Sequence, residues 1–425
     1  MKFTPFVSIL AALLLLSVSC QQAPAAIYYS DPVAGTAAGD GSAKAPWPKL
    51  QEVVSEGKLT KLQGGDTLLL RSGNHGDGKI SGENSKVITI AAEPGQTPRL
   101  SRLEITRGSK WLVKGLTITP SIATAPYKGN IVVMAEGGAG SDLVLEDCFI
   151  YTVPDSTKWT AEQWMETNSG VLLGRHGNNL TMRNNFIMNT RFAVSLCAPD
   201  SLCEGNVITN FSGDGIRITR DGITVQYNTV KNCFVGADQG DDNHDDLMQC
   251  FLFNKGTGTV RNVSIRGNIL IGNEDPDQPL RHDPQAIGFF DGPLVDFVVE
   301  KNVIRTNHYH GISLYDAVNC RILDNAVKAI SRQKMMPWVM LNSKNKGGSS
   351  GNTVKNNMAH SFNLKADPEV VAENNIPVDE TLFDRRFKDQ EDEINRKFGE
   401  FHPVSGLSRI GTRTEEHKAP ESLPK

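Results

Sequence analysis

The segment 238-DQGDDNHDDLMQCF-251 holds the densest group of ionisable side chains in this 425-residue chain, with five aspartates and one histidine within nine residues. Two later segments, 281-RHDPQ-285 and 307-NHYHGISLYD-316, carry three more of the nine histidines. Histidines act as general acids or bases when their surroundings tune them, and carboxylates do the same or bind calcium. The grouping predicts a functional site if the fold brings the three segments together.

A sequence repeat supplies the strands that would bring these three segments together. Segments of one shape recur as LEDCFIYT, MRNNFIMN, CEGNVITN, VQYNTVKN, IRGNILIG, VEKNVIRT, ILDNAVKA and VKNNMAHS. Their shared polar position falls at Cys148, Asn185, Asn206, Asn228, Asn268, Asn302, Asn325 and Asn357. The shortest steps run from 21 residues (Asn185 to Asn206) to 23 residues (Asn302 to Asn325). Short alternating runs with this period predict an all-β, right-handed parallel β-helix, with stacked asparagines that satisfy backbone groups at the turns.

The chain divides into three parts by composition. Residues 1–25 predict an export signal, with an apolar run ending before Cys20, which would be acylated in a bacterial lipoprotein; ordinary cleavage near Ala25 is the alternative. Residues 26–378 predict the β-helix, with a capping helix within the amphipathic stretch from Trp47 to Leu62. Residues 379–425 are charged and predict a short capping helix and a tail. We therefore expect an exported monomer in the periplasm or on the cell surface, touching a membrane only through an N-terminal lipid.

Composition excludes some classes of function. The net charge is −4, with no basic excess, so nucleic acid is not an expected partner. The cysteines after Cys20 show no metal-binding spacing, and most lie within apolar runs, so we expect buried free thiols. A Cys197–Cys203 disulfide is left open as an alternative.

Aligned coils predict which side chains share a face. The runs 193-AVSLCA, 215-GIRITR, 247-LMQCFL, 286-AIGFFD and 311-GISLYD follow successive turns. Alternation points their second residues inward, namely Val194, Ile216, Met248, Ile287 and Ile312. The third residues, Ser195, Arg217, Gln249, Gly288 and Ser313, point outward, as do the fifth, Cys197, Thr219, Phe251, Phe290 and Tyr315. The residues just before these strands would form a polar column of Asp214, Asp246, Gln285 and His310 along a groove.

The start GDTLLLRSGNH and the xNxI coils resemble secreted right-handed β-helix proteins that act on polysaccharides, such as pectate, alginate and chondroitin lyases and mannuronan C5-epimerases. NHDDLMQ resembles a His-x-Asp-x-x-Gln pattern of alginate-lyase-like proteins, which implies site roles for His244, Asp246 and Gln249. NHYHGISL is similar to a His-Gly-Ile run of the epimerases, which implies a role for His310. The Asp-Pro-His motif of those epimerases is missing, and 282-HDPQ inverts part of it.

The expected activity is β-elimination from a uronic-acid-containing polysaccharide such as alginate, pectate or a glycosaminoglycan. This reaction needs a group that binds the uronate carboxylate, a base for the C5 proton and an acid for the departing oxygen. Arg217, Gln249 and Arg220 are candidates for the carboxylate, His244 or His310 for the base, and Tyr315 or His282 for the acid. Other residues expected to bind substrate are Asp214, Asp246, Gln285 and His308.

Three alternatives stay open. Asp214 and Asp246, one coil apart, suit a glycoside hydrolase with paired carboxylates. C5-epimerisation uses similar groups, and a non-catalytic glycan-binding lipoprotein would need only exposed aromatic residues. Calcium is a further expectation, because Asp241, Asp242 and Asp245 could supply several of its oxygen ligands.

Overall fold

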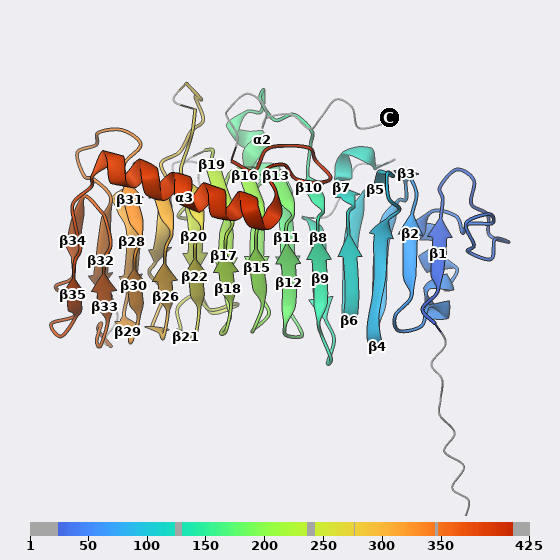
Figure 1. Cartoon of the computed structure of the whole chain (residues 1–425), viewed down its shortest axis with the longest axis horizontal. Coiled ribbons are helices and arrows are strands. Elements are labelled where there is room, and N and C mark those ends of the chain that lie inside the picture. The colour runs from blue at the N-terminus through green and yellow to red at the C-terminus, as the bar shows by residue number, and fades with distance from the viewer. Residues whose placement is uncertain (1–23, 124–129, 236–242, 276, 345–346, 411–425) are drawn as a thin grey trace, which may run out of the picture.

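The computed structural model describes residues 24–123, 130–235, 243–275, 277–344 and 347–410. Within these residues the chain forms parallel sheets of 22, 10 and 3 strands, stacked as coils along one long axis (Figure 1). Every pairing between strands is parallel and joins one coil to the next, as between β14 and β17 or β15 and β18. The parallel β-helix that the repeats predicted is therefore confirmed.

The largest sheet has two columns of strands. Column one, which bears the predicted groove, comprises β8 (Ile131–Gly137), β11 (Ser169–Leu173), β14 (Val194–Leu196), β17 (Ile216–Ile218), β20 (Asp246–Cys250), β24 (Gln285–Phe289), β28 (His310–Tyr315), β32 (Trp338–Asn342) and β34 (Ser361–Asn363). Column two comprises β9 (Leu143–Glu146), β12 (Leu180–Arg183), β15 (Leu202–Glu204), β18 (Thr224–Gln226), β22 (Ser264–Arg266), β26 (Val298–Glu300), β30 (Arg321–Leu323), β33 (Thr353–Lys355) and β35 (Val371–Glu373). The columns merge toward the N-terminus, where the long strand β6 pairs with both β8 and β9. The strands there are β1 (Ile27–Ser30), β2 (Thr67–Leu70), β4 (Asp77–Ala92) and β6 (Arg102–Lys114).

Two smaller sheets close the coils. The ten-stranded sheet comprises β3 (Gly73–Asn74), β5 (Pro98–Leu100), β7 (Thr117–Ile118), β10 (Phe149–Tyr151), β13 (Phe186–Thr190), β16 (Val207–Phe211), β19 (Thr229–Cys233), β23 (Ile269–Ile271), β27 (Val303–Arg305) and β31 (Ala326–Lys328). The three-stranded sheet comprises β21 (Val260–Arg261), β25 (Leu294–Val295) and β29 (Ala317–Val318). One buried core runs through all the coils.

The predicted asparagine stack is present between column two and the ten-stranded sheet. In each coil the asparagine Oδ1 accepts from the backbone N–H of the equivalent residue in the preceding coil, as from Asn228 to Asn268 at 2.9 Å. Its Nδ2 donates to a backbone carbonyl, as from Asn268 to Val225 at 3.0 Å, and to the next asparagine, Asn302, at 2.9 Å. These buried amides satisfy turn groups that the sheets leave unpaired, so the repeat is first a structural device.

The predicted register is confirmed on the inner face. Ile216 pairs with Met248, which pairs with Ile287, which pairs with Ile312, and all four are fully buried. At the fifth place, Cys197 and Thr219 are buried, whereas Phe251, Phe290 and Tyr315 are partly exposed. Strands β14 and β17 end at Leu196 and Ile218, so alternation stops before that place.

The cysteine expectation is also confirmed. Six cysteines of the described chain are free and buried, and Cys197 and Cys203 do not form a disulfide. Burial raises the pKa of the Cys148 thiol to about 12. These thiols therefore act as small core side chains.

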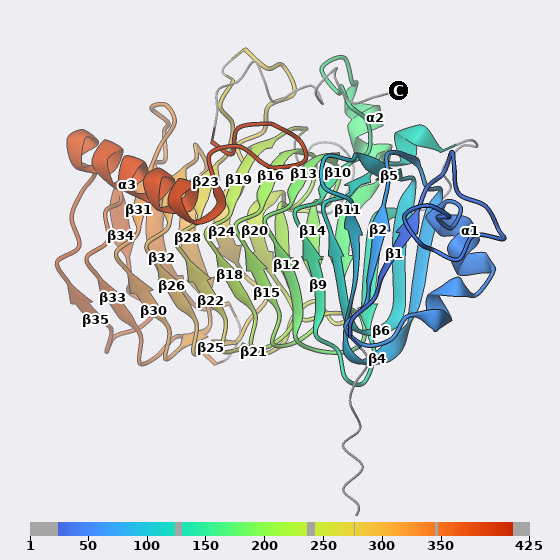
Figure 2. The ribbon, with the colours of Figure 1, turned by 45° about the vertical axis from the view of Figure 1, so that its right-hand side comes forward.

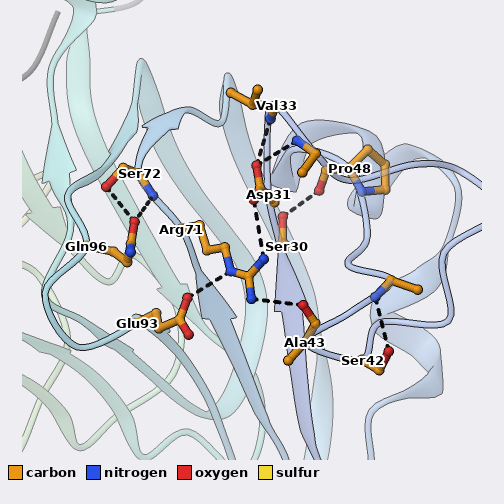
Figure 3. Close-up of polar contacts among 12 residues, drawn as sticks. Ser30, Asp31, Val33, Ser42, Ala43, Pro48, Arg71, Ser72, Glu93 and Gln96 are labelled. Atoms are coloured by element: carbon orange, nitrogen blue, oxygen red, sulfur yellow. Dashed lines mark hydrogen bonds and ion pairs between the residues drawn. The ribbon is translucent and has the colours of Figure 1, made fainter.

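The N-terminal segment contains the expected helix, α1 (Leu50–Ser55), followed by the 3₁₀ turn η1 (Lys58–Lys61). Leu50 and Val53 of α1 are buried in the core cluster, and α1 lies at the N-terminal end of the stack (Figure 2). Arg71 ties the preceding loop to the first coils, because its guanidinium contacts Asp31, Glu93 and the carbonyl of Ala43 (Figure 3). A capping function for α1 stays a prediction.

The C-terminal helix differs from expectation. α3 (Glu380–Phe398) has 19 residues and runs along the outside of the ten-stranded sheet instead of covering an end of the stack (Figure 1). Its buried Phe383 packs with Val303, Ala326 and Met358, because the apolar outer face of these short strands needs a cover. The chain continues to residue 410 against β13 and β16, where Arg409 is buried and donates to the Gly205 carbonyl.

The export signal with Cys20, and the tail beyond residue 410, lie outside the described residues, so export and lipidation stay predictions. Among the helices of the described chain, none has the length and apolar character needed to span a membrane.

Candidate active site

The candidate residues lie at one turn of the coil, between the ten-stranded sheet and column one. Insertions of three coils leave from this same turn, between β10 and β11, β19 and β20, and β23 and β24. The first contains α2 (Ala161–Glu166) and an irregular stretch, and its Trp164 packs against Phe234 and Leu280 of the other two. The segment with α2 projects beyond the strand ends (Figure 2). Stacked coils thus place segments far apart in sequence side by side.

Asp214 and Arg217 form the first pair of this column. Arg217 Nε lies 2.5 Å from Asp214 Oδ2, and Arg217 Nη2 donates to Asn243 Oδ1 at 3.0 Å. The Arg217 guanidinium also covers the face of the Phe192 ring, 3.4 Å from its centroid. Burial raises the pKa of Asp214, and the positive charge of Arg217 opposes that rise.

Asp246 is the equivalent residue in the next coil, and its carboxyl differs in having no partner. It is 0% exposed, and within the described chain neither carboxyl oxygen has a hydrogen-bond partner. Burial, reinforced by the negative charges of Asp214 and Asp245, raises the pKa of Asp246 well above its usual value. A buried carboxyl in this setting holds its proton, because the charged form has lost water and faces like charges.

Gly288 explains how this carboxyl is accommodated. A Cβ added to Gly288 would lie 2.9 Å from Asp246 Oδ1 and 2.7 Å from Gln285 Oε1, so both oxygens occupy the space a side chain would fill. Gln285 Oε1 is also buried without a hydrogen-bond partner in the described part of the chain. Gly288 occupies an outward-facing position of the register. Asp246 Oδ1 and Gln285 Oε1, which fill the space beside it, therefore lie on the outer face of column one.

The histidines of the three segments come together above this column. His282 Nε2 lies 3.8 Å from Asp245 Oδ2, and the ring centroids of His308 and His310 are 5.3 Å apart. Burial, with added repulsion from His282 and His244, lowers the pKa of His308 to about 4. His244 itself is exposed. The structure therefore brings together the residues that the sequence placed on separate coils.

His310 is held in a defined orientation. Its Nδ1 lies 2.7 Å from Ser313 Oγ, and Trp338 Nε1 donates toward the same Oγ at 3.2 Å and toward Nδ1 at 3.3 Å. Because the indole N–H can only donate, its contact with Nδ1 favours the neutral tautomer with the proton on Nε2. Burial lowers the pKa of His310 to about 3, so the ring stays neutral. This arrangement favours His310 as a hydrogen-bond donor over its predicted alternative role as base.

Other predicted residues fall at different places. Gln249 is partly exposed on the groove floor and pairs in register with Arg217 and Gly288. Tyr315 is partly exposed, with its ring 4.7 Å from that of Phe290. Arg220 lies beyond the opposite end of β17, where it lines a shallow hollow of about 450 Å³ with Phe253 and Lys255. The structure thus separates Arg220 from Arg217.

Three residues near the site were missed by the sequence argument: Asn243, Phe192 in its contact with Arg217, and Trp338. Trp338 pairs in register with His310, so it occupies the next place of the predicted column. Extending the aligned coils by one would have found it.

The calcium expectation stays a prediction. Asp241 and Asp242 lie outside the described residues. Within the described ranges, no group of three or more histidine, cysteine, aspartate or glutamate side chains is arranged to hold a metal ion. Asp245 is described, and it faces His282.

Known proteins resemble this chain in structure. No protein-family model matches the sequence, and no curated protein matches it. A solved structure described as a glycoside hydrolase matches with a TM-score of 0.54 and 10% identity, over 85% of this chain and 98% of that one. XylC in complex with xylose matches with a TM-score of 0.53 and 10% identity, over 78% and 75%. A mannuronic acid-specific family 6 polysaccharide lyase from human gut microbiota gives 0.45 and 13%, over 87% and 95%. At these identities the likeness concerns the fold, and the chain is a parallel β-helix protein.

Proposed function

We propose that this protein cleaves a uronic-acid-containing polysaccharide by β-elimination along column one, with Asp246 as the acid. The observation that carries the proposal is the state of Asp246, whose buried, unpartnered carboxyl has a pKa well above its usual value. A carboxyl that keeps its proton near neutral pH can deliver it to a leaving oxygen. The protonated carboxyl of Asp246 therefore suits the role of general acid in bond cleavage.

Neighbouring residues supply the other parts of the reaction. His282, whose Nε2 lies 3.8 Å from Asp245 Oδ2, is the candidate base for the C5 proton. As that proton leaves, its bonding electrons form the C4–C5 double bond and the C4–O4 bond breaks. O4 then takes the proton of Asp246. Because this carboxyl is fully buried, the side chains that cover it must move aside before the sugar, or a proton from solvent, reaches it.

Binding of the uronate carboxylate falls to Arg217 and Gln249. They pair in register on neighbouring strands, so they lie about 4.8 Å apart along the groove floor. The charge of Arg217 is already partly matched by Asp214, and a protonated Asp246 adds no further negative charge. The proton on Asp246 therefore also lessens the repulsion that an acidic sugar would meet.

Hydrolysis is the second candidate, favoured by the stacking of Asp214 and Asp246 in adjacent coils. Burial raises the pKa of both carboxyls, but Arg217 opposes the rise at Asp214, whereas the negative charges of Asp214 and Asp245 add to the rise at Asp246. Two carboxyls that hold their protons to different degrees suit the two roles of a glycosidase.

One experiment separates these activities. The purified protein is incubated with polymannuronate, polygalacturonate, chondroitin and an uncharged β-glucan. Ultraviolet absorbance of an unsaturated uronate together with new reducing ends supports β-elimination. New reducing ends without that absorbance support hydrolysis, and a changed uronate composition without cleavage supports epimerisation. Absence of any product from all four polymers contradicts the proposed function.

A further inference from the structure

Six aromatic rings form a continuous cluster beside the candidate acid. They come from β24, β28, β32 and the adjoining turns, namely Phe290, His308, Tyr309, His310, Tyr315 and Trp338. Adjacent ring centroids are 4.2 Å (His308 to Tyr309) to 5.4 Å (His310 to Trp338) apart. His310 is buried and the other five are partly exposed. The sequence contains 29 Phe, Tyr and Trp residues (17, 7 and 5), so four of them at one groove edge is a marked concentration.

The cluster is uncharged at neutral pH. Burial lowers the pKa of His308 to about 4 and that of His310 to about 3, so neither ring carries a proton beyond its neutral form. Trp338 Nε1 donates a hydrogen bond to Ser313 Oγ, which is also hydrogen-bonded to His310 Nδ1. These polar atoms of the cluster are therefore already paired within the protein. The partly exposed rings of the cluster include those of Tyr309 and Tyr315, which also carry hydroxyl groups.

Such a surface recognises a sugar by its shape and apolar face. The C–H face of a pyranose packs on an aromatic ring, and its hydroxyl groups bond to polar atoms at the ring edges. Contiguous exposed apolar patches rimmed by polar groups mark ligand-binding sites. The aromatic cluster lies further along the column that contains Asp246. A glycan bound at Asp246 and extended along this column therefore reaches the cluster.

We infer that Tyr309 and Trp338 form a sugar-stacking subsite for a further unit of the same glycan. The inference rests on the proposed function and adds where the chain lies. Gln285 pairs with Asp246, and Ile312 pairs with Ile287, which places His310 two coils from Asp246, about 10 Å along the axis. Trp338 lies one coil further. This is the reach of a few sugar units.

On the opposite side of Asp246, toward the N-terminus, the column presents a charged group. Phe192 lies two coils before Asp246, and the Arg217 guanidinium covers its ring face at 3.4 Å. A glycan is therefore held by stacking on one side of the cleavage point and by charge on the other. Binding at the aromatic subsite should be insensitive to salt, whereas contact with Arg217 should weaken as salt rises.

The test uses full-length protein carrying Asp246→Asn, so that bound oligosaccharide is not cleaved. Mannuronate oligomers and uncharged β-1,4-glucan oligomers are titrated by calorimetry, with and without Tyr309→Ala. Substitution at Tyr309 leaves its backbone carbonyl in place to accept from the N–H of Trp338. We expect Tyr309→Ala to weaken binding by about tenfold at both low and high salt, while Tyr309→Phe, which keeps the ring, stays within about twofold. Bound sugar should also change the fluorescence of Trp338, and Trp338→Phe should remove that change.

Two outcomes of the binding measurements overturn the subsite, and a third comes from kinetics. In the binding measurements, these are equal affinity of Tyr309→Ala and its parent for every oligomer that binds, and equal weakening by Tyr309→Phe and Tyr309→Ala. Failure of the proposed function looks different, because the wild-type protein would then cleave no polymer while the Tyr309 variants still changed oligosaccharide affinity. Cleavage by the wild type with an unchanged KM in Tyr309→Ala would reject the subsite alone.

Discussion

Replacement of Asp246 by asparagine tests the central feature of the site. Asparagine has nearly the same size and keeps a carbonyl oxygen beside Gly288, but it has no proton to deliver and no charge to bury. We expect kcat/KM on the cleaved polymer to fall by a factor on the order of 10²–10⁴, the usual contribution of a general acid. We also expect the folded protein to become more stable at neutral pH.

The sign of the stability change follows from the direction of the pKa shift. The pKa of Asp246 is raised in the folded state by burial and by Asp214 and Asp245, with Arg217 opposing and Asp291 adding to the rise. Between the unfolded pKa, about 3.9, and the folded pKa, the folded state therefore holds a proton that the unfolded state has released. Wild-type stability then falls as pH rises, by about 1.4 kcal/mol for each pH unit in that window. Asparagine does not titrate, so its advantage grows by up to about 2.7 kcal/mol from pH 5 to pH 7.

Urea unfolding at several pH values measures this difference, with circular dichroism as the signal. Asp283→Asn, at an exposed position of the neighbouring insertion, is the matched control and should show neither effect. A stability difference between wild type and Asp246→Asn that does not change with pH would refute the protonated state. Full activity of Asp246→Asn would refute its role as acid.

Three further predictions concern other parts of the molecule. The pKa of His310 is lowered to about 3, so wild-type stability should fall as pH drops below about 6.5, and His310→Phe should reduce that slope by about 1.4 kcal/mol per pH unit in urea unfolding. Asn268→Ala leaves buried groups of Asn228 and Val225 unpaired and should cost about 2–4 kcal/mol in the same measurement, whereas Asn178→Ala, at an exposed position, should cost little; equal effects would contradict the structural role of the asparagine stack. Phe383→Ala should cost about 3–5 kcal/mol by calorimetry because α3 then leaves the ten-stranded sheet poorly covered, and an unchanged Tm would show that α3 contributes little there.

Much of the fold could be predicted from single residues and their spacing. The marker asparagines, at steps near 22 residues, correspond to the observed stack, and alternation placed Ile216, Met248 and Ile287 inside. Alternation did not indicate the burial of Cys197 and Thr219, which lie past the ends of β14 and β17. The charged segment after residue 379 indicated a helix, but its docking face depends on which strands leave apolar side chains uncovered, which no local pattern reports.

The positions of the candidate site residues could be predicted from the sequence, whereas their protonation and hydrogen-bond partners could not. The aligned coils gave the column of Asp214, Asp246, Gln285 and His310, because a repeating fold converts sequence register into spatial register. They could not separate Arg220 from Arg217, since that depends on where strand β17 ends. Nor could they identify Trp338, which lies in the next coil and fixes the orientation of His310.

The sequence by itself determined the coil, the register and therefore which residues share the groove edge, because those follow from a period that the chain carries locally. Only the tertiary structure decided which carboxyl stays protonated, which nitrogen of His310 carries its proton and where aromatic rings gather. Protonation depends on burial and on charges from neighbouring coils, and those neighbours come together only through insertions whose packing no spacing rule describes.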